Sequence, residues 1–210
     1  FFMYEEGTGK AIWYTATGGF AANNDGTFSF TGTLQRYRGG QAATSTAYTA
    51  PVATNLGAVS IRFNGVNATV SLPGRTMSAT RYDFAGISVA ATISQPETGW
   101  YWNPLESGRG YAIEVQNNQA FVVMFHYNAD GSPTWNTAQG NIAQGALTTQ
   151  FNAFSGGQTL SGGWTRPSAA QSAGSIGLSF AGPCYGQLQL PGGSGVAAQR
   201  FGFGVAQSGD

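Results

Sequence analysis

Apolar and polar residues alternate one by one along most of the chain, and the three- to four-residue spacing of amphipathic helices is nearly absent. The alternation is clearest in residues 58–63, 68–72, 147–151 and 175–180. A period of two residues is typical of strands that bury one face. We therefore expect an all-β protein.

Short turn sequences separate these segments. Asn, Asp and Gly tolerate the positive φ angles that tight hairpin turns need, so such residues between two alternating segments predict antiparallel neighbours. Turns of this kind are expected at residues 24–26, 39–40, 73–74, 130–131, 156–157 and 192–193.

The chain contains two copies of one unit of roughly 110 residues. Such an internal repeat predicts tandem domains. Residues 37–41 match 154–158, residues 72–74 match 190–192, and residues 81–84 match 200–203. The stretch Gly99 to Gln116, GWYWNPLESGRGYAIEVQ, has no counterpart in the first copy. We divide the chain into a first β-repeat at 1–86, a linker at 87–98, a second β-repeat at 99–207 and a tail at 208–210. The alternation of Ile87, Val89, Ala91 and Ile93 predicts that the linker extends the preceding strand.

The second copy is expected to hold about eight strands joined by hairpin turns, a pattern that favours an up-and-down meander closed into a small barrel. A β-sandwich is the alternative. The first copy is expected to lack its opening strand. The strands are predicted near residues 109–116, 119–128, 133–142, 146–154, 158–166, 174–181, 185–190 and 196–204.

Composition narrows the classes of function. Charged residues make up 9% of the 210 residues, and the formal net charge is zero. Such a chain has no electrostatic attraction for nucleic acid or for an anionic membrane surface. Its single cysteine, Cys184, allows no intrachain disulfide. No apolar run is long enough for a membrane helix. The neutral, glycine-rich and amide-rich composition favours a secreted protein.

The segments GWYWNPLESGRGYAIEVQ, FHYNADGSPTW, LPGG and QRFGF together resemble an uncharacterised tandem repeat of secreted proteins from Gram-negative bacteria. The resemblance covers the second copy and the first copy from Phe1 onward, and it implies an extracellular or cell-surface location but no activity. The Gly-x-Trp-like start formed by Gly99, Trp100 and Trp102, together with Arg200 on the last predicted strand, is similar to the lipocalin and avidin superfamily. That second resemblance implies a closed barrel.

The sequence offers little material for catalysis. His126 is the only histidine, whereas a catalytic base needs an orienting partner and a metal site needs several ligands. The expected turns at Asp25 and Asp130 account for these carboxylates without a metal. We therefore expect no enzyme, no cofactor and no metal.

The carboxylates Glu106 and Glu114 lie in the unpaired stretch with Arg109. A glycosidase would need two carboxylates that face a sugar. Structural ion pairs are the simpler interpretation, because a buried charge needs a partner. We expect Glu106 to pair with Arg109, and Glu114 to pair with Arg200 where the barrel closes.

Trp100, Tyr101, Trp102 and Asn103 are the candidate ligand-binding residues, since flat rings beside an amide suit the faces and hydroxyls of a sugar. The alternative is that these rings fill one end of the barrel.

A first copy without its opening strand would expose unpaired backbone groups at a sheet edge. We therefore expect a structural protein that self-associates or takes a strand from a neighbouring subunit, forming an extracellular filament or surface layer. A chain shortened at its N-terminus is the alternative explanation of the open edge. The alternative function is a carbohydrate-binding or adhesion module.

Overall fold

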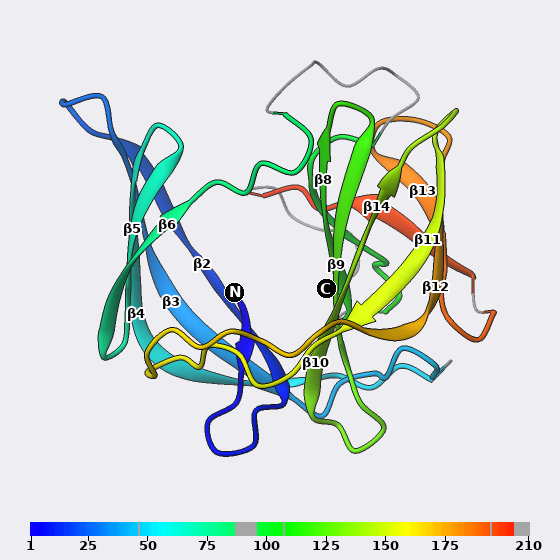
Figure 1. Cartoon of the computed structure of the whole chain (residues 1–210), viewed down its shortest axis with the longest axis horizontal. Helices are drawn as coiled ribbons and strands as arrows, with labels where there is room; N and C mark the ends of the chain where they lie inside the picture. Colours follow the sequence, from blue (N-terminus) through cyan, green and yellow to red (C-terminus); the bar gives the residue numbers. More distant parts are fainter. Residues whose placement is uncertain (46, 87–95, 107, 194, 204–210) are drawn as a thin grey trace. The chain divides into compact units, whose positions relative to one another are not determined.

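The computed structural model describes residues 1–45, 47–86, 96–106, 108–193 and 195–203, and these residues form two antiparallel β structures (Figure 1). The first is an open sheet of six strands in chain order. Its strands are β1 (Phe2–Tyr4), β2 (Ala11–Ala22), β3 (Phe28–Arg38), β4 (Val52–Asn64), β5 (Asn67–Leu72) and β6 (Arg75–Thr80).

The second structure is a closed barrel of eight strands, in which the last strand pairs with the first. Its strands are β7 (Gly99–Trp102), β8 (Gly110–Gln116), β9 (Gln119–Tyr127), β10 (Pro133–Asn141), β11 (Ala146–Ala153), β12 (Gln171–Phe180), β13 (Tyr185–Gln189) and β14 (Gly195–Arg200). The expected all-β, barrel-forming architecture is confirmed.

Alternation along the strands builds the barrel interior. Every strand contributes at least one buried apolar side chain to a single core, because successive side chains of a strand point to opposite faces. The turn between β8 and β9 shows the expected local chemistry: Asn117 and Asn118 have φ angles of 43° and 63°. Two successive residues with positive φ make the hairpin turn that matches strand twist.

Two predicted details of the second copy are wrong. The chain from 158 to 166 forms no strand, and Gly99–Trp102 forms one that the pattern did not indicate. The turns expected at Gly39-Gly40 and Gly156-Gly157 are not hairpins, because long irregular segments follow them. The predicted strand extension at Ile87, Val89, Ala91 and Ile93 lies outside the described residues.

The six-stranded sheet repeats part of the barrel. Phe2 pairs with Trp13 and Met3 with Ile12, just as Phe125 pairs with Trp135 and His126 with Thr134. Strands β1 to β6 therefore correspond to β9 to β14. Among the described residues, the first copy has no counterpart of two strands, β7 and β8, whereas one missing opening strand was predicted.

A further contact repeats in the same place. Gly57 in β4 has a φ of 119° and lies against Pro73, while Gly174 in β12 has a φ of 96° and lies against Pro191. The same backbone geometry thus recurs where the two copies share a Gly and a Leu-Pro-Gly turn.

The two compact units of the chain do not follow the boundaries of the two copies. The first unit contains Phe1–Tyr37, Val52–Tyr82 and Ser155–Pro167, and the second contains the remaining segments, among them Arg38–Pro51. Residues 38–51, which we call the first strap, thus come from the first copy but belong to the second unit. Residues 155–167, the second strap, come from the second copy but belong to the first unit.

Candidate functional site

The residues expected to bind a ligand lie along β7 and point in opposite directions. Tyr101 is fully buried in the barrel core, where its ring meets Phe180 edge to face at 5.4 Å. Its hydroxyl lies 2.7 Å from the carbonyl oxygen of Glu97 and 2.8 Å from that of Pro183. Burial raises the pKa of Tyr101. This tyrosine is a core residue.

Trp100 and Trp102, on either side of Tyr101, belong to the other face of β7 because strand side chains alternate. Trp100 stacks on Phe125 with 5.1 Å between ring centroids. Trp102 meets Phe201 edge to face at 5.4 Å. Each indole thus already has an aromatic partner within the barrel unit.

Asn103 has a local role. Its side-chain oxygen accepts a hydrogen bond from the backbone N–H of Leu105 at 3.1 Å, and its carbonyl accepts one from Glu106 at 2.9 Å. This is the Asx-turn chemistry that shapes the loop after β7. The four residues do not form one flat aromatic face with an amide beside it.

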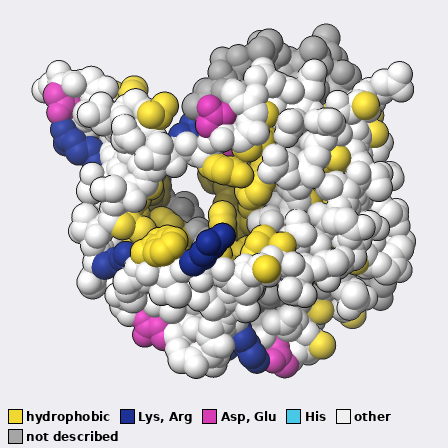
Figure 2. All heavy atoms as spheres, in the orientation of Figure 1, with side chains coloured by type: hydrophobic (Ala, Val, Ile, Leu, Met, Phe, Trp, Pro, Cys, Tyr) yellow, Lys and Arg dark blue, Asp and Glu magenta, His cyan; other side chains and the backbone are white. Residues whose placement is uncertain are grey.

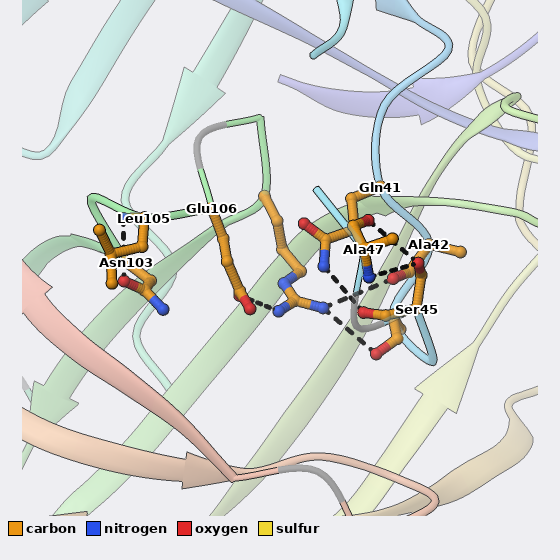
Figure 3. A network of polar contacts seen from close by, with 9 residues as sticks. Gln41, Ala42, Ser45, Ala47, Asn103, Leu105 and Glu106 are labelled. Carbon is orange, nitrogen blue, oxygen red and sulfur yellow. Dashed lines mark hydrogen bonds and ion pairs between the residues drawn. The ribbon is translucent and has the colours of Figure 1, made fainter. Parts of the chain in front are cut away.

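The expected pair of Glu106 and Arg109 does form, and it anchors the first strap (Figure 3). Arg109 is 4% exposed. Its guanidinium contacts the Glu106 carboxylate and donates to the carbonyl oxygens of Ala43 at 3.2 Å and Ala42 at 3.5 Å. A buried arginine thus joins the loop between β7 and β8 to the strap.

The first strap has three other attachments in the second unit. The N–H of Gly39 donates to the carbonyl of Gly131 at 2.8 Å. Gly40 lies flat on the ring of Tyr127, where an added Cβ would come within 2.0 Å of a ring carbon. Farther along, Ala42 bridges to Tyr127 in parallel register.

The second strap repeats these attachments in the first unit. The N–H of Gly156 donates to the carbonyl of Gly9 at 2.8 Å. Gly157 lies on the ring of Tyr4, with an added Cβ 2.1 Å from a ring carbon, and Thr159 bridges to Tyr4 in parallel register. The two straps are therefore equivalent in contact as well as in sequence.

Polar contacts fix the end of the second strap. The guanidinium of Arg75 donates to the carbonyl of Gly162. The carboxylate of Glu6 accepts from Ser161, and these hydrogen bonds lower the pKa of Glu6. The strap thus contacts both ends of the open sheet, the loop after β1 and the start of β6.

The other expected ion pair takes a different form. Arg200 contacts Glu97 at 3.3 Å, with both side chains partly exposed. Glu114 instead accepts a hydrogen bond from Gln116 at 2.9 Å. The pairing of Glu114 with Arg200 is therefore not the contact that the structure contains.

His126 is buried, with Nε2 2.7 Å from the side-chain oxygen of Asn136 and Nδ1 3.2 Å from the carbonyl of Tyr127. Burial lowers its pKa. Asp25 and Asp130 accept hydrogen bonds from Thr27 and Ser132 within their turns. Within the described segments, no three His, Cys, Asp or Glu side chains lie close enough to bind a metal.

None of the described residues belongs to a helix of the length and apolar character that a membrane span requires. No family model matches the chain, and comparisons with curated proteins and with solved structures give no match either.

The straps are the feature that sequence reasoning missed. Their signal was present, because Gly39-Gly40-Gln41 and Gly156-Gly157-Gln158 occupy equivalent places in the repeat. The glycine pairs were interpreted as hairpin turns, whereas each glycine pair provides the close approach to an aromatic ring that seats a strap.

Proposed function

We propose that this protein is a secreted, non-catalytic structural subunit that assembles by strand complementation at its six-stranded sheet. One observation carries the proposal: the sheet reproduces β9 to β14 of the barrel in order and register, without counterparts of β7 and β8. Within the described residues, β6 has one strand neighbour, β5. Such an edge offers backbone donors and acceptors to an incoming strand.

The open sheet also exposes apolar side chains on its interior strands. Phe20 on β2 and Phe28 on β3 stack on each other at 5.5 Å and are 64% and 45% exposed. In the barrel, by contrast, the strands bury a continuous apolar interior. An added pair of strands would cover the exposed apolar side chains of the open sheet. The free energy gained from burying them would add to that of the backbone hydrogen bonds.

The surface suits an ordered extracellular assembly. Few charged side chains are visible in Figure 2, in keeping with the low charged fraction of the chain. Neutral surfaces can approach one another with little electrostatic repulsion.

Electron microscopy of the native material at neutral pH, purified together with its associated polypeptides, tests the proposal. We expect regular filaments or sheets from the parent chain and dispersed particles from Thr80→Pro. Leu72 and Arg75 close a two-residue turn, so they bond to each other and the backbone of Thr80 points away from β5. Thr80 corresponds to Gln199 of β14, which pairs with Trp102 of β7. Proline there removes an outward N–H and leaves the β5 ladder intact. Thr80→Val, which keeps the N–H, is the matched control. Dispersed parent particles at every concentration would contradict the proposal.

The alternative of a glycan-binding module has less support from the geometry, because Trp100 stacks on Phe125 and Trp102 meets Phe201 edge to face, both within the barrel unit. A glycan array with Trp100→Ala and Trp102→Ala as controls tests that alternative.

A further inference from the structure

We propose that the six-stranded sheet accepts a two-stranded hairpin with the β7–β8 pattern, carried by a neighbouring polypeptide. The arginine of this hairpin donates hydrogen bonds to the carbonyl oxygens of Thr159 and Leu160 in the second strap. The inference rests on the proposed function and names the partner segment of the same site.

The width of the gap follows from the barrel. Its strand order runs from β14 through β7 and β8 to β9. Because β6 corresponds to β14 and β1 to β9, the interval between the two sheet edges corresponds to two strands. A single donated strand would leave an edge unpaired, whereas a hairpin would pair with both.

The arginine site follows from the equivalence of the straps. Ala42 bridges to Tyr127 and Thr159 bridges to Tyr4, so Thr159 corresponds to Ala42. The next residues, Ala43 and Leu160, are both partly buried against their own cores. Arg109 donates to the carbonyls of Ala42 and Ala43, so the corresponding acceptors in the first unit are the carbonyls of Thr159 and Leu160.

These acceptors are available within the described part of the chain. Ser45 donates its N–H to the carbonyl of Ala42 at 3.1 Å. The corresponding N–H, that of Gly162, donates instead to the side-chain oxygen of Thr159 at 3.0 Å. No described residue donates a hydrogen bond to the carbonyl of Thr159 or of Leu160, and a partly buried carbonyl favours a donor.

Arg75 does not occupy this position. It donates to the carbonyl of Gly162, which corresponds to the carbonyl of Ser45. In the second unit, the side chain of Gln41 donates to that carbonyl, at 2.8 Å. Arg75 therefore makes the hydrogen bond that Gln41 makes in the second unit. The position that corresponds to Arg109 is left for the arginine of the incoming hairpin.

A count of segments points to the source of the hairpin. The pattern Trp-Asn-Pro-x-Glu-Ser-x-Arg-Gly occurs once in the 210 residues, at 102–110, and each chain has two sites that can hold it, one per unit. If copies of this chain exchanged their hairpins, one site per chain would still be unfilled. Filling both sites therefore needs a further segment of this pattern, and the proposed function places that segment on a neighbouring polypeptide.

A labelled synthetic peptide with the sequence of residues 98–116 tests the inference when it is titrated into the full chain. We expect saturable binding at one peptide per chain, at least tenfold weaker binding of the Arg109→Ala peptide, and intermediate binding of the Arg109→Lys peptide. Thr80→Pro in the full chain should abolish binding, because Thr80 corresponds to Gln199, which pairs with β7, and Thr80→Val should preserve it.

A graft provides a second measurement, since an isolated hairpin is marginally stable in water. Phe1 corresponds to Met124 by strand register, so residues 98–123 are placed directly before Phe1. We expect the graft to raise the urea midpoint of unfolding and to abolish peptide binding. A graft carrying Arg109→Ala should raise the midpoint less.

Each result decides a separate point. A lack of binding together with an unchanged midpoint of the graft would overturn hairpin docking, and so would equal binding to Thr80→Pro. Equal affinity of the Arg109→Ala peptide would overturn the strap contact.

An intact mass above that of the 210 residues in native material, with the pattern in the extra segment, would overturn the proposal that a neighbouring polypeptide supplies the hairpin. Filaments without peptide binding would leave the proposed function standing, whereas binding without filaments would contradict that function alone.

Discussion

Gly40 and Gly157 show how one missing atom positions a whole segment. Each lies on a buried tyrosine ring, and an added Cβ would meet that ring at 2.0 or 2.1 Å. We expect Gly40→Ala and Gly157→Ala each to lower the free energy of unfolding by about 1–3 kcal/mol, as overpacking does. Urea denaturation followed by circular dichroism measures the effect.

Gly19→Ala is the matched control for these two variants. Gly19 lies within β2, and an added Cβ would have no neighbour within 4 Å. The free energy of unfolding of Gly19→Ala should stay within about 0.5 kcal/mol of that of the parent chain, or rise, because alanine has fewer backbone conformations than glycine in the unfolded chain. Equal stability of Gly40→Ala and Gly19→Ala would show that the first strap does not rest on Tyr127.

His126 gives the molecule a pH-dependent stability. Burial is the main cause that lowers its pKa in the folded state, and the charge of Arg109 adds to it. The unfolded histidine titrates near 6.5. Below about pH 6.5 the imidazole of His126 therefore binds a proton in the unfolded chain, whereas in the folded chain it does so only at lower pH. The free energy of unfolding falls as the pH falls toward the folded pKa.

The His126→Gln variant isolates this contribution. Its urea midpoint should change less between pH 7.5 and pH 5.5 than that of the parent chain. Burial also lowers the pKa of the Phe1 amino group to about 6, so variant and parent are compared at each pH. Parallel pH profiles of the two chains would exclude His126 as the source of the dependence.

At the scale of elements, the loop between β7 and β8 secures the first strap through a buried ion pair. Glu106→Gln leaves the guanidinium of Arg109 buried without its carboxylate. We expect a loss of about 3 kcal/mol in unfolding free energy, since an unpaired buried charge is costly. Thermal unfolding measures this loss.

Glu97→Gln is the control for the ion pair, because the contact of Glu97 with Arg200 is partly exposed. Exposed pairs contribute less than about 1 kcal/mol. If Glu106→Gln cost no more than Glu97→Gln, the first strap would not depend on the buried pair.

The elements that sequence could predict are those whose burial is one-sided. Strands β11 and β12 alternate because one face meets the barrel core. Strand β7 has four residues and three successive aromatics, so it shows no alternation to detect. The chain at 158–166 leaves the barrel as a strap, and its Leu160 packs against the core of the first unit. Such packing follows from tertiary contacts and has no period.

At the scale of the whole molecule, the repeat predicted two β units but not which unit each segment joins. Internal similarity identifies equivalent segments, and both straps were aligned correctly on that basis. Two equivalent segments can fold back on their own copies or exchange places without any change in sequence pattern. The exchange became visible only through contacts such as that of Gly157 with Tyr4.

The exchange of straps makes a prediction about cooperativity. Each unit contains a segment from the other copy, so unfolding of one copy withdraws a strap from the unit that remains. We expect the parent chain to unfold in a single transition, with coincident curves from tryptophan fluorescence and circular dichroism. Trp100, Trp102 and Trp135 lie in the second unit and weight fluorescence toward it.

The double variant Gly40→Val and Gly157→Val should uncouple the two units, because both straps lose their seats on Tyr127 and Tyr4. We expect its fluorescence and circular dichroism curves to separate, with two transitions in calorimetry, whereas Gly19→Val keeps one. Two transitions in the parent chain would mean that the straps are held too weakly to couple the units. A single transition in the double variant would locate the coupling elsewhere in the chain.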